Sequence, residues 1–307
     1  MIIIGAGLAG AIAKGFFSSY SPQVFEARKE PGSLHKAILR FRDPSIGYLL
    51  GIPLDKIVVA KRIYFRGKFV DENPMLSNMY SKKVSQGIYH RSIEADDDVE
   101  RFVAKKDFGI LTANYGKMLI KVEPNKCFFK DGTQVDYDVC ISTIPLPVMA
   151  KAANLDVSNT EIKSYTIYVA RLPIVTKCDV YQTIYFPDSN NFVYRATLEP
   201  DVLIIESIGA EFPIGEIDEV LEVFGLDTND VGQPSIFAQE MGKIVEMDDT
   251  IRKNLILELT EKFGVYSLGR YATWRNITSD VLLNDLEVIS KMLGLDKKYQ
   301  IRLEHAK

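Results

Sequence analysis

Hydrophobic positions at the start of the chain form a strand-like run and then a helix-like run. Ile2 to Ile4 is short, apolar and β-branched, as in a buried strand, and the longer apolar segment Leu8 to Phe17 is typical of a helix. A glycine-rich turn separates the two runs. Gln23 to Ala27 then supplies a second short strand. The pattern predicts strand, glycine turn, helix and strand at the beginning of the chain.

The turn has the pattern Gly5-x-Gly7-x-x-Gly10, and each glycine has a physical reason. Gly5 permits a tight turn, Gly7 lets a pyrophosphate approach the backbone, and Gly10 lets the helix pack against the strand. The phosphates are expected on the N–H groups at the helix start, which include those of Leu8 and Ala9. The spacing predicts a dinucleotide site, with a glycine-rich turn in another kind of α/β unit as the alternative.

An acid ends the second strand at the distance that dinucleotide-binding folds use. Glu26 comes 21 residues after Gly5. Its carboxylate can accept hydrogen bonds from both hydroxyls of an adenosine ribose. We include the next two residues, Ala27 and Arg28, in the predicted cofactor site.

The middle of the chain alternates between strand-like and turn-like segments. Short polar connections between the later strands favour an antiparallel sheet, which would form the wall of a substrate pocket beside the nucleotide domain. The expected strands are 117–122, 127–129, 137–145, 165–171, 180–186, 192–196 and 202–208, and the expected helices are 74–87, 217–224 and 250–263. Asp96 to Asp98 is expected to cap a further helix that runs through Lys106.

Residues 37–95 do not continue a simple nucleotide-binding sheet, and we assign them to an insertion. Within it, 63–70 is expected to form a hairpin around Arg66-Gly67. The insertion is rich in basic residues, for which a solvated face and an anion site are the two interpretations. The basic residues concerned are Arg40, Arg42, Lys61, Arg62 and Arg66.

Composition excludes several classes of protein. The 307 residues suit two interleaved domains, and the net charge of −4 argues against a broad nucleic-acid-binding face. Cys127, Cys140 and Cys178 are odd in number and lack CxxC spacing, so we expect reduced thiols in a cytoplasmic protein. No apolar run approaches the roughly 20 residues that a membrane span requires, and no signal peptide is expected before Ile2. No metal site is expected.

The segment after Glu26 resembles a recurring element of the two-dinucleotide-binding flavoproteins. In that family a glycine-rich loop follows the ribose acid and passes over the flavin side of the cofactor. This chain has Gly32-Ser33 where many relatives have two glycines. The resemblance implies that Gly32 and Ser33 lie against the cofactor, and the serine hydroxyl could reach a phosphate.

Two later segments resemble the same group of proteins. Tyr137 to Pro145 is similar to a family strand, YD-x-x-I-x-T-x-P, that returns to the sheet beside the cofactor. Gly269 to Arg275 resembles the GR-x-x-x-aromatic-basic run of the flavin amine oxidase and UDP-galactopyranose mutase group. The resemblance implies that Gly269 lets the backbone approach the cofactor and that Arg270 neutralises pyrophosphate charge. A surface ion pair is the alternative for Arg270.

The helix after this run is expected to begin at Asp280-Val281. On the resemblance, its first N–H groups point at the pyrimidine edge of the flavin, where reduction places negative charge. The bound dinucleotide would then be FAD. A second glycine fingerprint for NAD(P)H is absent from the sequence, so oxygen is the expected electron acceptor if the reaction is a net oxidation.

The resemblance implies a fold class and a division of the chain. The expected fold is α/β, with a two-dinucleotide-binding, Rossmann-like FAD domain and an interleaved antiparallel-sheet substrate domain. We expect residues 1–36, 96–150 and 264–307 in the FAD domain. The substrate or cap domain would then hold 37–95 and 151–263.

Candidates for catalysis are few. His35 and Lys36 follow the flavin loop and are our candidates near the ring, against a packed or solvated histidine. Arg195, in a hairpin that resembles the mutase substrate wall, could clamp a carboxylate or phosphate. Its alternative role is that of a cross-strand partner for Glu199 or Glu206.

The run His35 to Arg42 also resembles one in bacteriophage flavoproteins linked to thymine hypermodification. That resemblance implies oxidation of an amino-acid adduct on a modified nucleobase, with nucleic acid as a partner. Three hypotheses follow: an FAD-dependent oxidoreductase or lyase acting on a CH–NH bond of an amine, a mutase-like enzyme of sugar nucleotides without net redox change, and a non-catalytic dinucleotide-binding protein. The sequence leaves the substrate and the oligomeric state undetermined.

Overall fold

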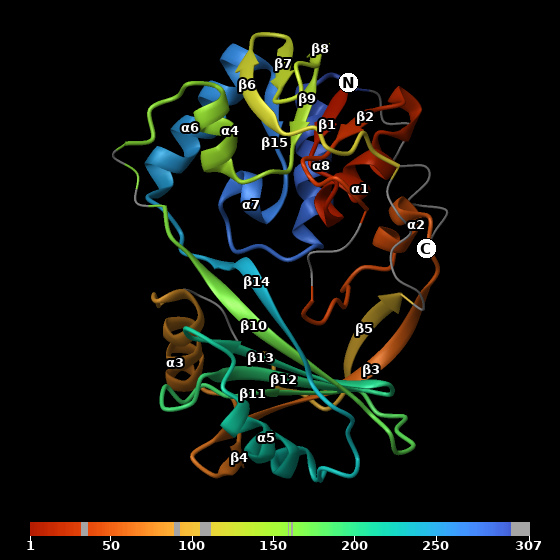
Figure 1. The fold of residues 1–307 in the computed structure, drawn as a ribbon, viewed down its shortest axis with the longest axis vertical. Coiled ribbons are helices and arrows are strands. Elements are labelled where there is room, and N and C mark those ends of the chain that lie inside the picture. The colour runs from red at the N-terminus through yellow and green to blue at the C-terminus, as the bar shows by residue number, and fades with distance from the viewer. Residues whose placement is uncertain (32–35, 89–92, 105–111, 159, 161, 296–307) are drawn as a thin grey trace.

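The chain folds around two sheets that lie one above the other in Figure 1. The computed structural model describes residues 1–307 except 32–35, 89–92, 105–111, 159, 161 and 296–307. The upper part is built on a four-stranded parallel sheet, and the lower part on an eight-stranded sheet. Two long strands, β10 (Ser164–Pro173) and β14 (Ser235–Ile244), rise from the lower sheet toward the upper part.

The parallel sheet has the strand order β15-β9-β1-β2. Its strands are β1 (Ile2–Ile4), β2 (Gln23–Phe25), β9 (Cys140–Ser142) and β15 (Val265–Ser267). Each neighbouring pair is parallel, with Ile3 opposite both Val24 and Ile141. The carboxyl ends of all four strands therefore meet at one edge of the sheet.

Alternation along β1 sends its side chains into two separate cores. Ile3 is buried against α1 (Leu8–Phe16) and α8 (Val281–Met292) on one face. Ile2 and Ile4 are buried on the other face, in a core with α4 (Leu146–Ala152) and α6 (Asp249–Phe263). The meander β6 (Leu119–Glu123), β7 (Lys126–Phe129) and β8 (Gln134–Asp136) adds to this second core. The sheet is thus covered on both faces.

The lower sheet runs in the order β14-β10-β13-β12-β11-β3-β4, with β5 paired to β3 outside this path. All its pairs are antiparallel except β11 with β3, which are parallel, so the expected antiparallel sheet is in fact mixed. The remaining strands are β3 (Leu54–Phe65), β4 (Lys68–Val70), β5 (Val99–Ala104), β11 (Gln182–Tyr185), β12 (Val193–Glu199) and β13 (Val202–Ile208).

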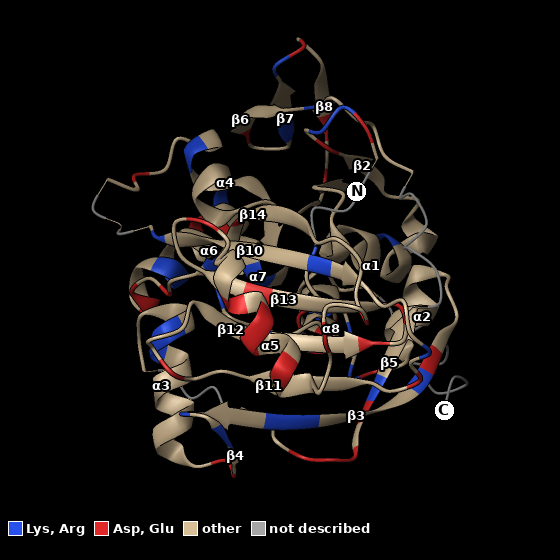
Figure 2. Cartoon of the chain, turned by 60° about the horizontal axis from the view of Figure 1, so that its bottom comes forward, with Lys and Arg blue, Asp and Glu red and all other residues tan. Residues whose placement is uncertain are grey.

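A helix packs against each face of the lower sheet. Helix α5 (Ile217–Phe224), preceded by η2 (Ile214–Glu216), packs below it, and α3 (Pro74–Ser85) lies against its other face. Figure 2 shows acidic residues gathered on α5 and basic residues along β3. The remaining helices are η1 (Ser18–Tyr20), α2 (Ser45–Leu50) and α7 (Gly269–Thr273).

Among the described residues, one predicted element has the wrong type. Asp96 to Asp98 does not start a helix, because Val99 to Ala104 forms strand β5 on the free edge of β3. Asp97 pairs with Arg62 across these strands instead of capping a helix. The hairpin at Arg66-Gly67 is confirmed, and both residues have the positive φ that its turn requires. Helix α2 and strand β14 were not predicted.

No described helix combines the length and apolar character needed to cross a membrane.

Candidate cofactor site at the carboxyl edge of the parallel sheet

Four segments distant in sequence meet where the parallel strands end. Gly5 follows β1 directly, Glu26 follows β2, and Thr143 follows β9. Gly269 begins α7, two residues after β15. Open parallel sheets bind their ligands outside the carboxyl ends of the strands, where loop backbone and helix starts are exposed. This edge is therefore the candidate site.

The glycine turn is tightly fixed from within the fold. Gly5 has a φ of +103°, and a Cβ there would overlap the hydroxyl of Thr143. A Cβ on Gly10 would overlap the carbonyl oxygen of Gly5, so the close approach of α1 to the turn requires glycine. Thr143 Oγ1 donates to the carbonyl of either Ile4 or Gly5, at 3.0 and 3.2 Å. Sequence reasoning included Thr143 in a family motif but missed its contact with the turn.

Glu26 is tied to the same turn through its carboxylate. One oxygen accepts the backbone N–H of Ala6 at 2.7 Å, and the other accepts that of Arg28 at 3.0 Å. The Arg28 guanidinium lies 3.1 Å from the carboxylate and 3.4 Å from the carbonyl of Ala6. Burial works to raise the pKa of Glu26, but the bonds from Arg28 and Ala6 outweigh it and the pKa lies below its usual value. The acid is held ionised. Each of its oxygens accepts one backbone N–H and one bond from the Arg28 guanidinium, so a ligand hydroxyl would take the place of the guanidinium.

The start of α1 offers room and donors for a phosphate. Gly7, its N-cap, has nothing within 4 Å of the position of an added Cβ, and no side chain caps the helix. The first turn also contains no acid that would repel an anion. The N-terminal N–H groups of a helix carry partial positive charge and bind phosphate well. The residues here fit a dinucleotide pyrophosphate.

The C-terminal segment reaches the same place. Gly269 has a φ of +90°, and a Cβ there would lie 2.9 Å from Ala9 Cβ and 3.3 Å from Leu282 Cδ2. This glycine therefore packs α7 against the starts of both α1 and α8. Arg270 Nη2 lies 3.3 Å from the carbonyl of Ile277, across the loop that carries Trp274.

The start of α8 differs in detail from the expectation. The N–H of Val281 donates to the carbonyl of Thr278 at 3.2 Å, so it is already engaged. Asp280 Oδ1 is buried and lacks a hydrogen-bond partner among the described residues. A buried carboxylate oxygen of this kind needs a donor, and the N3–H of a flavin pyrimidine is one. The segment thus fits the flavin end of FAD.

Of the predicted catalytic residues, Lys36 and Arg195 contact strands of the lower sheet. Lys36 is held there by backbone contacts, since its N–H donates to Gln239 Oε1 at 3.2 Å and its carbonyl accepts from Arg171 at 3.1 Å. Its ammonium group lies 5.1 Å from the ring centre of Phe237. His35, Gly32 and Ser33 lie outside the described residues.

Arg195 forms an ion pair with Glu206 across the strands, which was the alternative to its role as a clamp for a substrate anion. Its Nε and Nη2 donate to the two carboxylate oxygens at 2.7 and 2.8 Å. Burial would raise the pKa of Glu206 and lower that of Arg195, but their attraction reverses both directions. Both groups are therefore charged, and the bidentate face of Arg195 is occupied by Glu206.

Of the two interpretations of the basic insertion, a solvated face is wrong for Arg40 and Lys61. The side chains of Arg40 and Lys61 are only 6% and 8% exposed. Arg40 donates to Glu199 Oε1 at 3.1 Å and to Thr183 Oγ1 at 3.0 Å. Arg42 and Arg62 are about half exposed, as a solvated face requires.

Comparisons with known proteins give a fold but no sequence family. No family model matches the chain, and no curated protein matches it in sequence. The structure is similar to reduced UDP-galactopyranose mutase, with a TM-score of 0.73 and 15% identity over 97% of this chain and 94% of the mutase. The fold is shared with FAD-dependent enzymes.

Two further solved structures extend this similarity. A fatty acid isomerase from P. acnes that produces CLA has a TM-score of 0.58 and 10% identity, over 94% of this chain and 97% of that chain. A protein from Photorhabdus luminescens put forward as an FAD-containing monooxygenase has a TM-score of 0.52 and 12% identity, over 97% and 90%. Similarity at such identities concerns the fold, and the reactions of these proteins differ from one another.

The described residues contain no group of three or more His, Cys, Asp or Glu side chains able to hold a metal ion.

Proposed function

We propose that the protein is an FAD-dependent enzyme whose cofactor binds along the carboxyl edge of the parallel sheet. One observation carries the proposal: the ionised Glu26 is hydrogen-bonded to the turn that carries the open N-cap at Gly7, and Gly269 packs the C-terminal segment against the start of α1. In that position the N-terminal N–H groups of α1 would hold the pyrophosphate. Glu26 would accept the ribose hydroxyls, and the segment from Gly269 to Asp280 would border the flavin.

Bound FAD would supply hydride chemistry at the flavin ring. The protein's contribution would be to bind the cofactor, to exclude water and to hold a substrate beside it. The lower sheet is our candidate for the substrate wall, because Lys36 and Arg40 connect the segment after the ribose acid to strands of that sheet. On this proposal 1–36, 96–150 and 264–307 would serve the cofactor, except for β5, which belongs to the lower sheet.

For the reaction, we propose oxidation at a CH–NH bond of an amine, either as an oxidase or as a lyase. An amino-acid adduct on a modified thymine in DNA is our candidate substrate, and it rests on the sequence resemblance of residues 35–42 alone. The test is aerobic turnover of the FAD-loaded protein with a panel of amines and modified DNA, monitored by release of hydrogen peroxide and by bleaching of the flavin. Bleaching by an amine under anaerobic conditions supports the proposal. A flavin that no amine reduces contradicts it.

A mutase-like reaction without net redox change is the second candidate. The fold match to UDP-galactopyranose mutase over almost the whole of both chains favours it. The expected signature is conversion of a sugar nucleotide only after the flavin has been reduced with dithionite. FAD that stays bound but reacts with neither class of substrate would favour the third hypothesis, a non-catalytic dinucleotide-binding protein.

A further inference from the structure

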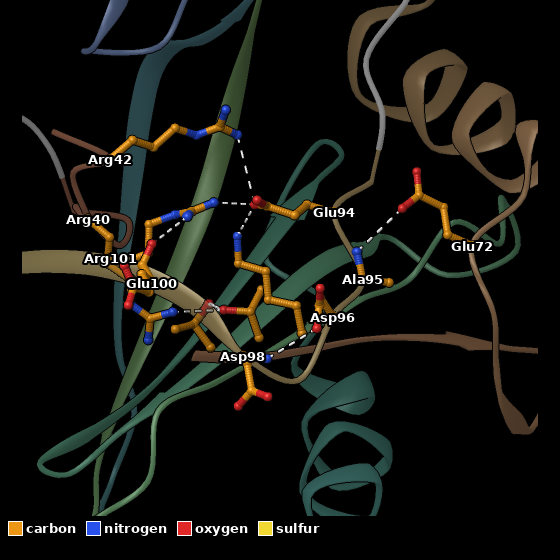
Figure 3. A network of polar contacts seen from close by, with 12 residues as sticks. Arg40, Arg42, Glu72, Glu94, Ala95, Asp96, Asp98, Glu100 and Arg101 are labelled. Atoms are coloured by element: carbon orange, nitrogen blue, oxygen red, sulfur yellow. Dashed lines mark hydrogen bonds and ion pairs between the residues drawn. The ribbon is translucent and has the colours of Figure 1, made fainter. Parts of the chain in front are cut away.

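A cluster of three cations surrounds one carboxylate beside strands β3 and β5 of the lower sheet, and we call it the Glu94 cluster (Arg42, Lys61, Glu94 and Arg101). Lys61 and Arg101 both donate to the same oxygen of Glu94, and Arg42 lies 3.8 Å from it. Figure 3 shows the three cationic groups converging on that oxygen. One negative charge thus faces three positive charges.

The neighbouring carboxylates do not supply the missing negative charge. Glu100 pairs with Lys56, Asp97 with Arg62, and Glu199 with Arg40. Figure 3 shows the Glu72 carboxylate facing Ala95, whose N–H it accepts, and no ion pair joins it to the cations. Within the described part of the chain, the three cations of the Glu94 cluster share one carboxylate, which leaves the cluster with a net charge of +2.

The cluster has a buried floor and an open side. Lys61 and Arg101 are 8% and 11% exposed, whereas Glu94 and Arg42 are 36% and 52% exposed. An anion could therefore enter beside Arg42 and reach Lys61. Burial lowers the pKa of Lys61 to about 8, although Glu94 acts in the opposite direction, so the ammonium is mainly charged at pH 7.

A further basic residue, Arg40, is bonded to the strand next to Lys61. Lys61 is the register partner of Thr183 in the parallel pair of β3 and β11, and strands in a sheet are about 4.8 Å apart. Arg40 donates through Nη1 to the hydroxyl of Thr183, and its Nη2 is buried with no partner among the described residues. A buried, unsatisfied donor on a guanidinium is costly unless a ligand accepts from it.

We propose that the Glu94 cluster is an anion-binding subsite for a phosphoryl group of a small molecule. A phosphoryl dianion matches this net charge of +2, whereas a carboxylate matches only half of it. The low exposure of Lys61 and Arg101 suits a single small group better than the backbone of a nucleic acid. Among the candidate substrates the sugar nucleotide of the mutase-like reaction carries such a group, so the catalytic meaning of the subsite rests on that proposed function, while its binding test does not.

The test is calorimetric titration of inorganic phosphate at pH 7 into the full chain preincubated with excess FAD, which fills any phosphate site at α1. Lys61→Met is expected to weaken phosphate binding about tenfold, since one charged hydrogen bond is lost. Glu94→Gln is expected to strengthen it, because the competing carboxylate is removed. Lys56→Met, which removes the same charge from an exposed pair on the same strand, should leave the affinity within about twofold. Acetate should bind more weakly than phosphate.

Equal affinity for phosphate in the wild type, Lys61→Met and Lys56→Met would overturn the proposal. A Glu94→Gln variant that is folded by circular dichroism and binds phosphate as weakly as Lys61→Met would also overturn it, since the cluster would then be structural. Displacement of phosphate by a short DNA duplex would reassign the site to a nucleic-acid backbone. A protein that takes up no FAD but keeps the expected order of the variants would contradict the proposed function and leave this inference standing.

Discussion

The hydroxyl of Thr143 occupies the space that a side chain at Gly5 would need. It also lies within hydrogen-bond distance of the carbonyls of Ile4 and Gly5, so the end of β9 fixes the turn after β1. The two residues are far apart in sequence and meet because β1 and β9 are parallel neighbours. The glycine turn is thus shaped before any ligand arrives, which lowers the cost of ordering it on binding.

A substitution at Gly7 should affect cofactor binding without affecting folding. Its backbone is extended, and an added Cβ would meet nothing within 4 Å, so Gly7→Val should change the free energy of unfolding by no more than about 1 kcal/mol. The new side chain would fill the space predicted for the pyrophosphate. We expect FAD affinity to fall by about a hundredfold, or about 2.7 kcal/mol, in a fluorescence titration.

Gly215→Val is the matched control, because Gly215 in η2 also has open space around its Cβ position. It should bind FAD like the wild type. If Gly7→Val is folded and also binds FAD like the wild type, the pyrophosphate does not lie at the start of α1.

Replacing only one partner of the ion pair between Arg195 and Glu206 should lower the free energy of unfolding strongly. Glu206→Leu leaves the guanidinium without its bidentate partner and is expected to destabilise the fold by about 3–5 kcal/mol. Arg195→Met combined with Glu206→Leu removes both charges and should recover most of that loss. Urea unfolding of the two single variants and the double variant measures the coupling. Losses that simply add would show that the pair is not coupled.

Lys83 joins α3 to the hairpin of β11 and β12. Its ammonium donates to the carbonyls of Phe186, Asp188 and Val193 at 2.8, 2.5 and 2.7 Å. Lys83→Met leaves these acceptors without their donor and is expected to cost about 2 kcal/mol of unfolding free energy. Lys82→Met, an exposed neighbour on the same helix, is the control and should change it by less than about 0.5 kcal/mol. Equal effects of the two substitutions would contradict this role.

Glu94 should make the stability depend on acid pH. Burial tends to raise its pKa, but the bonds from Lys61 and Arg101 lower it to about 2, against an ordinary value of 4.5. Since the folded pKa is depressed, its contribution is complete above pH 4.5 and is lost as the pH falls toward 2. Glu94→Gln should flatten the stability profile in that window. Glu100→Gln, in the exposed pair with Lys56, should leave the profile unchanged, and equal flattening by both would refute the assignment.

The glycine turn, the helix after it and Glu26 at the end of the next strand were predictable because their signals are local. Gly5 and Gly10 report backbone geometry that only a few neighbouring residues determine. The hairpin at Arg66-Gly67 followed from turn chemistry in the same way. Such features need no knowledge of the rest of the chain.

Features decided by distant partners escaped prediction. Val99 to Ala104 is a strand because the edge of β3 was free to pair with it. The acidic residues before it, Asp96 to Asp98, had led to the prediction of a helix. Arg40 is buried because Glu199, 159 residues later, lies opposite it. The convergence on Glu94 has the same origin, since its cations come from the segment before α2, from β3 and from β5. The cofactor and catalytic roles of the predicted residues remain predictions.

The most direct test of the central claim is the visible absorption spectrum of the purified protein, repeated after denaturation with the released cofactor identified by mass. We predict flavin absorption bands in the folded protein, or their recovery on addition of FAD, and release of intact FAD on unfolding. A colourless protein that takes up no added FAD would contradict the assignment of the carboxyl edge of the parallel sheet as a flavin site.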